Sequence, residues 1–170
     1  LNNYAFAGCP NLTSVSFPAC TSIEQNAFFW CTNVSSVNLP VCTDIGIRAF
    51  CGCTALVSVG VSKCLNLSTG AFTNCYNLKY VSFPNCISIG TNAFANCSNL
   101  TSVFLPVCTN VDEGAFSNCH SLTSVNFPVG KSIGYATFSN CSSLTSVSFP
   151  VCTSIGSYAF DNCSSLTSVS

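Results

Sequence analysis

The sequence has very little charge. Among 170 residues it has four Lys or Arg and five Asp or Glu, so 5% of the chain is charged, against roughly 25% in a typical soluble domain. The four cations, Arg48, Lys63, Lys79 and Lys131, are scattered singly, and the formal net charge is −1. A module that binds nucleic acid by neutralising phosphates needs a cluster of Lys and Arg. The composition therefore excludes that class and also a basic membrane-surface patch.

Long apolar runs are missing as well. Mean hydropathy is +0.50, yet the longest uninterrupted apolar run covers only residues 27–31. A membrane-spanning helix needs about 20 apolar residues, so none is expected. Residues 1–4 have neither a basic segment nor an apolar one, and no secretory signal is expected within this stretch.

The chain also lacks convergent titratable groups. The only histidine, His120, directly follows Cys119, and Asp112–Glu113 is the only adjacent carboxylate pair. Neighbouring residues of a repeat point in different directions, so His120 and Cys119 are not expected to form a nucleophile pair, and Asp112 and Glu113 are expected on a solvated turn. No Gly-rich phosphate loop or H-E-x-x-H sequence occurs. We therefore expect no enzymatic activity, no cofactor and no metal site.

What the sequence does contain is a strict 22-residue repeat. A phenylalanine column and a cysteine column recur at this spacing without a single insertion, accompanied by Leu and Val columns. The phenylalanine column is Phe6, Phe28, Phe50, Phe72, Phe94, Phe116, Phe138 and Phe160, and the first cysteine column is Cys9, Cys31, Cys53, Cys75, Cys97, Cys119, Cys141 and Cys163. A unit this short cannot bury a core by itself, so the copies must stack and share one.

A second cysteine column and an aliphatic column complete the unit. The second cysteine column is Cys20, Cys42, Cys64, Cys86, Cys108 and Cys152, and Gly130 takes the place of the sulfur once. The consensus is L-x-x-V-x-F-P-x-C-x-x-I-G-x-x-A-F-x-x-C-x-x. The fold class that this predicts is a repeat solenoid, one domain over residues 1–170 with about 7.7 copies of the repeat.

Local signals assign the parts of each unit. Residues 14–17 alternate polar and apolar, which indicates a strand with Val15 and Phe17 inward. The following Pro18 lacks a backbone donor and ends the strand. Glycines after the aliphatic column are predicted to adopt positive φ in a tight turn; they are Gly46, Gly90, Gly134 and Gly156. The Ala-Phe-x-x-Cys segment is predicted to form a turn, or one turn of helix or 3₁₀ helix, on the opposite side.

With these parts in place, the unit resembles the leucine-rich repeat, with Leu12, Val15, Phe17 and Cys20 on its signature positions. It is most similar to the BspA-like, or Treponema pallidum-type, subclass, whose units carry a proline after the strand and an Ile-Gly-x-x-Ala-Phe-x-x-Cys tail, as in residues 89–97. The resemblance covers the whole chain and implies a right-handed coil with a parallel β-sheet on one face. Known members are mostly surface proteins of host-associated bacteria and some protozoa, and several are adhesins for extracellular-matrix proteins.

The cysteines are predicted to be buried free thiols that act as packing elements. Their spacing is periodic, and their total of 15 is odd, unlike the irregular spacing of disulfide-dense scaffolds. Scattered disulfides between stacked rungs are an alternative, because adjacent rungs lie within disulfide reach. A metal site is a further alternative, although no C-x-x-C pair occurs. Cys51 alone lies outside both columns, and we interpret it as a substitution at a surface turn.

The strand face carries the candidate binding site. Its outward positions are nearly all small and polar, but Lys79, Tyr80 and Phe104 break this pattern in adjacent repeats. Exposed aromatic side chains supply contact area at low entropic cost, so these three residues are the predicted partner-binding site. The alternative is sequence drift in a tolerant surface column.

Asparagine acceptor sequons suggest glycosylation sites. They occur at Asn11, Asn33, Asn66, Asn96, Asn99, Asn140 and Asn162. Glycans at these positions would explain how so uncharged a surface stays in solution.

The predicted function is a non-enzymatic binding module, extracellular or at a cell surface, that recognises a protein or a glycan through its strand face. The sequence opens on the aliphatic column and stops inside a strand, whereas solenoids are sealed by capping repeats, so we expect a window on a longer array. The alternative is a filament subunit that stacks end to end with copies of itself. A third possibility is recognition of a repetitive surface such as ice by the Ser and Thr columns.

Overall fold

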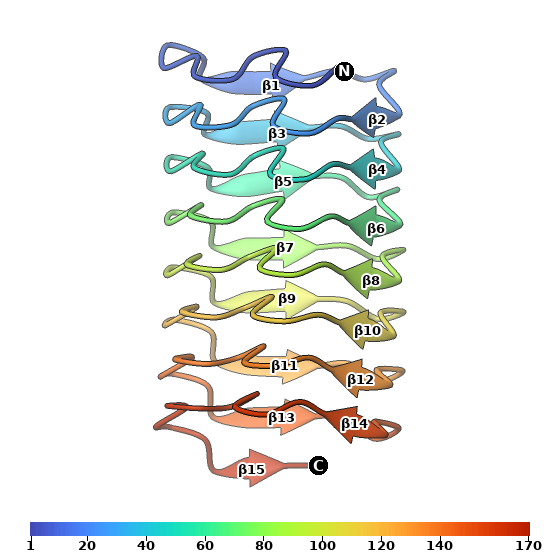
Figure 1. Cartoon of the computed structure of the whole chain (residues 1–170), viewed down its shortest axis with the longest axis vertical. Helices are drawn as coiled ribbons and strands as arrows, with labels where there is room; N and C mark the ends of the chain where they lie inside the picture. The colour runs from blue at the N-terminus through green and yellow to red at the C-terminus, as the bar shows by residue number, and fades with distance from the viewer.

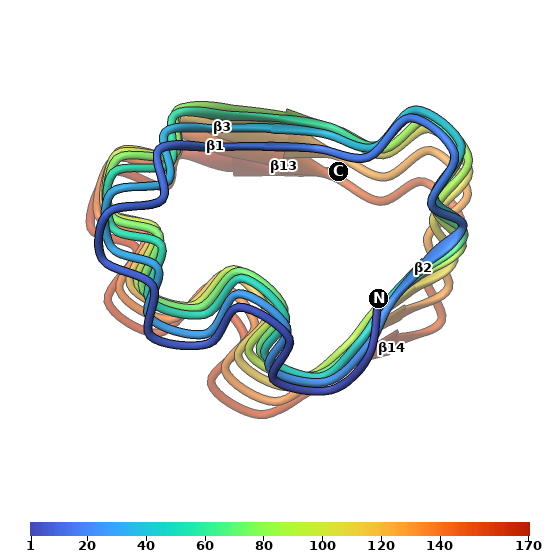
Figure 2. The same ribbon diagram turned by 90° about the horizontal axis from the view of Figure 1, so that it is seen from above.

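The computed structural model describes all 170 residues as one solenoid, with the N- and C-termini at opposite ends of the stack (Figure 1). Each 22-residue repeat makes one turn, which we call a rung. A rung carries a three-residue strand on one side, a two-residue strand on a second side and a series of turns on the third (Figure 2). No helix occurs, and so nothing in the structure could serve as a membrane-spanning helix. The predicted repeat solenoid is confirmed.

The longer strands form the face that we call the strand face. They are β1 (Ser14–Ser16), β3 (Ser36–Asn38), β5 (Ser58–Gly60), β7 (Tyr80–Ser82), β9 (Ser102–Phe104), β11 (Ser124–Asn126), β13 (Ser146–Ser148) and β15 (Ser168–Val169). They pair in parallel, one repeat apart, in the orders β1-β3-β5, β7-β9 and β11-β13-β15. Val15 is buried between two exposed serines, as the alternation predicts.

A second sheet lies on a neighbouring side of the solenoid. It is a continuous seven-stranded parallel sheet of two-residue strands, and their aliphatic residues are mostly buried: β2 (Ser22–Ile23), β4 (Asp44–Ile45), β6 (Asn66–Leu67), β8 (Ser88–Ile89), β10 (Asn110–Val111), β12 (Ser132–Ile133) and β14 (Ser154–Ile155). The sequence predicts one sheet on one face, and this second sheet was not predicted. Two residues are too few to display the alternation by which a strand is recognised.

The third side of each rung, the turn side, has a repeating pattern of backbone hydrogen bonds. Alternate N–H groups bond within the rung and to the next rung: Gly70 N donates to Thr91 O at 2.8 Å, and Ala71 N donates to Ser68 O at 3.2 Å. An α-helix needs every interior N–H for its own ladder. Since half of these N–H groups donate to the next rung instead, this segment forms turns. The one-turn helix that the sequence offered as an alternative is wrong.

The core is built around a stack of phenylalanine rings. Successive rings of the column from Phe6 to Phe160 are parallel within 9°, with centroids 5.1–5.5 Å apart. Phenylalanines of the strand-end column, such as Phe83, pack against this stack with centroids 5.9–6.5 Å apart. Phe94 is fully buried. The core is therefore one continuous column of apolar side chains that crosses every rung.

The prediction that Gly46, Gly90, Gly134 and Gly156 adopt positive φ is wrong. Positive φ occurs instead at two other columns, mostly at asparagine and at four different glycines. The glycines after the aliphatic column are required for space: a Cβ on Gly90 would lie 2.7 Å from Leu67 O of the preceding rung, and one on Gly134 would lie 2.6 Å from the Asp112 carbonyl carbon. They allow two rungs to approach each other closely.

All fifteen cysteines are free thiols, eleven of them buried. In the first column each thiol from Cys31 onward donates to a carbonyl of the preceding rung, as Cys75 does to Phe50 O at 3.3 Å. In the second column each thiol donates to the carbonyl two residues later, as Cys64 does to Asn66 O at 3.3 Å. The thiols fill the core and satisfy backbone carbonyls, which is the packing role that the sequence predicts.

Burial keeps these thiols protonated. Loss of solvent raises the pKa of Cys86 to about 11 and the pKa of Cys108 and Cys141 to about 12, from an ordinary value of 9.0. It raises the pKa of Cys75 and Cys119 further still. Since the thiolate is the reactive species, the core thiols are chemically inert at neutral pH.

We expect Phe94→Ala to destabilise the fold by about 3–5 kcal/mol, because it removes a fully buried ring and leaves a cavity in the stack. Phe104→Ala removes a ring that is 49% exposed, and should cost about 0.5 kcal/mol or less. Urea denaturation followed by circular dichroism measures both. A cost below about 1 kcal/mol for Phe94→Ala would mean that the inside and the outside of the solenoid have been exchanged.

Gly90→Ala should destabilise the protein by about 1–3 kcal/mol, because the new methyl group collides with backbone of the preceding rung. Ser68→Ala is the matched control, since position 68 is the same column one repeat earlier and already carries a Cβ. Thermal unfolding compares the two. Equal melting temperatures would refute the close approach of rungs at this column.

Stability should fall steeply at alkaline pH. The unfolded chain loses its thiol protons near pH 9, whereas the folded chain holds those of Cys86, Cys108 and Cys141 to about pH 11–12. Stability is therefore full below pH 9 and falls as the pH rises through this window, by about 1.4 kcal/mol per pH unit for each thiol. We expect the melting temperature to fall by about 10 °C or more per unit above pH 9.

The double variant Cys86→Ser, Cys108→Ser is the control for this dependence. Serine keeps a donor for the carbonyls of Ser88 and Asn110 but does not titrate in this range, so the slope should become shallower. A melting temperature of the original chain that stays level from pH 8 to about 10.5 would contradict the assignment to buried thiols.

Candidate functional site

The structure brings the predicted binding residues together on the strand face. Tyr80 starts β7 and Phe104 ends β9, and the register pairs Tyr80 with Ser102 and Ser82 with Phe104. The two aromatic side chains therefore lie diagonally across two adjacent strands, and each is 49% exposed. Lys79 is exposed beside them. We call these three residues the aromatic patch.

Two further exposed side chains extend this region and were missed by the sequence analysis. Val57, on the rung before, is exposed, and its carbonyl accepts a hydrogen bond from Lys79 N at 3.3 Å. Tyr76 is exposed at the corner that leads into β7. The signal was present, because Val57 interrupts a column of Thr and Ser, and Tyr76 stands in a column of small or polar residues.

The threonine column beside the strands is engaged in rung-to-rung bonding. The Thr101 hydroxyl donates to Lys79 O at 2.9 Å, and the Thr145 hydroxyl donates to Thr123 O at 3.0 Å. A hydroxyl has only one donor, so these side chains have none left for a ligand. This arrangement disfavours recognition of ice or a glycan lattice by the threonine ladder.

The titratable residues singled out in the sequence do not converge. The Cys119 thiol is buried and donates to Phe94 O at 3.3 Å. The His120 ring is exposed, with Nδ1 2.9 Å from Asn140 O. Asp112 and Glu113 are exposed on the turn after β10. These groups therefore do not assemble a nucleophile and a base, as catalysis would need.

Asparagines on the turn side form a ladder of side-chain amides. Nδ2 of Asn96 donates to Oδ1 of Asn74 at 2.8 Å, and Asn118, Asn140 and Asn162 each repeat the bond at 2.9–3.1 Å. All five have positive φ, which asparagine tolerates better than most residues.

This ladder divides the seven predicted glycosylation sites into two groups. Asn96, Asn140 and Asn162 use the Nδ2 to which a glycan would be attached as a ladder donor. The remaining sites, Asn11, Asn33, Asn66 and Asn99, are exposed outside the ladder, although Nδ2 of Asn33 donates to Pro10 O at 2.6 Å and Nδ2 of Asn99 donates to Asn77 Oδ1 at 3.4 Å. Glycosylation at all seven positions stays a prediction, and only at Asn11 and Asn66 would a glycan be attached to an Nδ2 that makes no rung-to-rung hydrogen bond.

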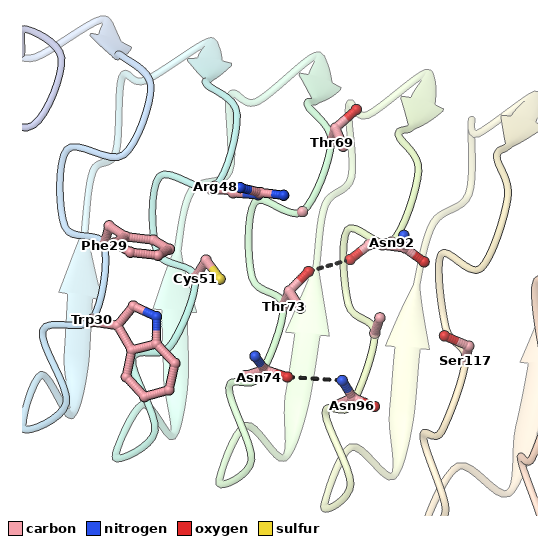
Figure 3. Close-up of a pocket in the computed structure, with 12 residues that line it drawn as sticks. Phe29, Trp30, Arg48, Cys51, Thr69, Thr73, Asn74, Asn92, Asn96 and Ser117 are labelled. Carbon is pink, nitrogen blue, oxygen red and sulfur yellow. Dashed lines mark hydrogen bonds between the residues drawn. The ribbon is translucent and has the colours of Figure 1, made fainter.

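The turn side also contains a pocket that the sequence analysis did not predict. Its volume is about 460 Å³, and it lies across the turns that follow β2, β4, β6, β8 and β10, where the outline of the rungs folds inward (Figures 2 and 3). The lining residues are Phe29, Trp30, Arg48, Cys51, Thr69, Gly70, Thr73, Asn74, Asn92, Ala95, Asn96 and Ser117. Cys51, interpreted from the sequence as a surface substitution, is a buried part of this lining.

Two large side chains stand out in the pocket, Trp30 and Arg48. Each occupies a positive-φ position, where other repeats mostly carry asparagine or glycine. A Cβ on Gly52 would lie 2.8 Å from Cδ2 of the Trp30 indole, and one on Gly70 would lie 3.2 Å from Cγ of Arg48. Each side chain therefore lies against a glycine of the next rung. Burial raises the pKa of the neighbouring Cys51 thiol, and the positive charge of Arg48 lowers it in part.

Comparison with known families and structures agrees with this architecture. The BspA-type leucine-rich repeat region, in six copies, matches residues 1–119 and 87–170. A leucine-rich repeat protein of T. pallidum is similar with a TM-score of 0.85 and 28% identity over 91% of this chain and 78% of its own. One from Bacteroides ovatus has a TM-score of 0.70 and 26% identity over 96% of this chain, which spans only 50% of that protein.

A leucine-rich cell surface protein from Faecalibacterium prausnitzii shares the fold, with a TM-score of 0.61 and 23% identity over 97% of this chain and 61% of its own. No curated protein matches the chain. Because the family match extends over every repeat of the described solenoid, the chain belongs to the BspA-type leucine-rich repeat family.

Proposed function

We propose that this chain is a non-enzymatic binding module that recognises a protein partner through the aromatic patch on its strand face. The observation that carries the proposal is the pair of half-exposed rings, Tyr80 and Phe104, on the adjacent strands β7 and β9. Aromatic side chains are among the residue types that dominate the binding energy of protein interfaces.

The surroundings of the patch favour a protein partner. The neighbouring outward positions are mostly serines, such as Ser58, Ser82 and Ser102, so the two rings rise above a low and uncharged surface. The strands beneath them are held by parallel pairing, and a rigid scaffold lowers the entropic cost of binding. Leucine-rich repeat proteins of this family are in general protein-binding scaffolds, which supports the same choice.

We place this binding outside the cell or at its surface. BspA-type leucine-rich repeat proteins are typically surface or secreted proteins. The many free thiols are compatible with an oxidising location, because eleven of the fifteen are buried and burial suppresses the thiolate that oxidation requires.

A second candidate function is self-association, as in a filament subunit. An exposed aliphatic side chain occurs on each of six consecutive rungs at the corner between the two sheets, in two columns that are two residues apart: Val41, Val107, Val129 and Val151 in one, and Leu65 and Ile87 in the other. Exposed apolar side chains grouped at one corner can pack against a second copy. Electron micrographs that show filaments of the isolated chain would favour this candidate over the binding module.

The double variant Tyr80→Ala, Phe104→Ala should weaken partner binding by a factor of about 10 or more, because both rings contribute buried area at the interface. Biolayer interferometry of the chain against purified extracellular-matrix glycoproteins and collagens measures this. The melting temperature should remain that of the original chain, since both rings are half exposed.

The matched control is Tyr135→Ala, Tyr158→Ala. These two rings are also exposed and lie on successive rungs, with their centroids 5.7 Å apart. They follow β12 and β14 and therefore lie on the turn side, away from the aromatic patch. This variant should bind the partner as the original chain does. Equal loss of binding in both variants, or undiminished binding by the first, would remove the aromatic patch as the binding site.

A further inference from the structure

The pocket on the turn side has features that the packing of the solenoid does not require. Trp30 is the only tryptophan of the chain, and with Arg48 it is held at φ of 55° and 52°. Side chains this large rarely adopt positive φ. Every rung has positive φ at these two columns, so the fold imposes the backbone conformation and leaves open which side chain stands there. The same positions could hold asparagine, as Asn74 and Asn92 show on later rungs.

The pocket holds the Trp30 ring in place. Three atoms of its five-membered ring lie within 3.1 Å of the position that a Cβ on Gly52 would take, so one face of the indole rests on the glycine backbone. Phe29 packs edge-on against it, with centroids 6.3 Å apart and planes at 81°. Trp30 nevertheless remains 45% exposed. A fixed aromatic face open to solvent attracts the polarised C–H bonds of a sugar ring.

The pocket combines one positive charge with several polar side chains, of which Thr73 and Asn96 already donate, to Asn92 O at 2.6 Å and to Asn74 Oδ1 at 2.8 Å. The lining contains no Asp or Glu, so the guanidinium of Arg48 is its only charged group. Asn74 uses its Oδ1 to accept from Asn96, which leaves its Nδ2 on the side toward Cys51 (Figure 3). The hydroxyl of Thr69 and the amide of Asn92 add further polar groups to the lining. Such a set fits a ligand with hydroxyls and a carboxylate.

The size of the pocket and its backbone favour a small ligand over a peptide strand. A volume of about 460 Å³ lies in the range of pockets for small molecules. A peptide that adds as a strand needs unpaired backbone groups. Here Gly70 N and Asn74 N donate to the next rung, and Ala71 N and Thr73 N donate within their own. Recognition in this pocket must therefore come from side chains.

From these observations we propose that the turn-side pocket binds a sugar unit that carries a carboxylate, with the ring stacked on Trp30 and the carboxylate paired with Arg48. The inference is independent of the aromatic patch, which lies on the strand face. A single chain would then present one face to a protein and another to an acidic glycan.

The position of Trp30 provides a direct test, because the intrinsic tryptophan fluorescence of the chain comes from this pocket alone. The chain is titrated with trigalacturonic acid, 3′-sialyllactose and a hyaluronan tetrasaccharide, each to about 10 mM, with maltotriose and lactose as neutral controls. Isothermal calorimetry accompanies each titration. We expect at least one acidic sugar to bind saturably and at least about tenfold more tightly than the neutral ones.

Arg48→Gln keeps a polar side chain but removes its charge, and should weaken binding of the acidic sugar by a factor of about 10 or more. Lys131→Gln removes a cation that does not line the pocket and should leave binding unchanged. Tyr80→Ala, Phe104→Ala should also bind the sugar normally, so failure of the pocket and failure of the aromatic patch are distinguishable. Circular dichroism confirms that each variant is folded.

Three results would overturn the proposal. No heat and no fluorescence change with any acidic sugar would exclude the ligand class. Unchanged affinity of Arg48→Gln would exclude the role of the guanidinium. Tighter binding of triglutamate than of the acidic sugars would assign the pocket to an acidic peptide instead.

Discussion

Every feature of this protein depends on the requirement that each rung lie directly over the one before it. Backbone N–H groups of one rung donate to carbonyls of a neighbouring rung, as Phe72 N does to Ala93 O, 21 residues later, at 2.8 Å, and an insertion of one residue would leave buried donors without partners. This requirement is the reason that the repeat keeps a fixed length of 22 residues along the sequence. The stacked rings of the phenylalanine column follow from it, because identical side chains are placed one above another at the distance at which rungs bond.

The same requirement explains why the chain has so little charge. A column of charged residues would hold like charges at about the 4.8 Å separation of neighbouring strands, where they repel. Amides, hydroxyls and thiols avoid this cost, since each can donate to the preceding rung. Asn96 is donor to Asn74 and acceptor from Asn118, and the Cys97 thiol donates to Phe72 O. Neutral hydrogen-bonding side chains are thus the polar residues that a stack of identical rungs accommodates best.

This physics also decides what could be predicted. The buried columns were identified from the sequence because stacking forces one residue type to recur, and Phe94 and Val81 are buried as expected. The role of Gly90 was misjudged: the period reveals that a glycine is needed, but not whether φ or space requires it. Tyr80 and Phe104 were found as departures from a uniform column. The pocket was missed because its residues come from several columns, and only the fold shows that Trp30 and Arg48 share a cavity with rungs further along.

Residues that depart from the repeat are the ones free to bind a partner, because a residue of a regular column already uses its contacts and hydrogen bonds on the adjacent rungs. Replacing an asparagine of the ladder column by Trp30 and Gly52 gives up amide bonds on those rungs, and it opens the space that becomes the pocket. Tyr80 and Phe104 replace small polar side chains on β7 and β9. Val81, which follows Tyr80 in β7, is still buried. Since each rung contacts only its neighbours, such changes are local in a solenoid. The aromatic patch and the pocket lie on different sides of the solenoid, and the residues of each can be altered while the stacked core beneath both remains intact.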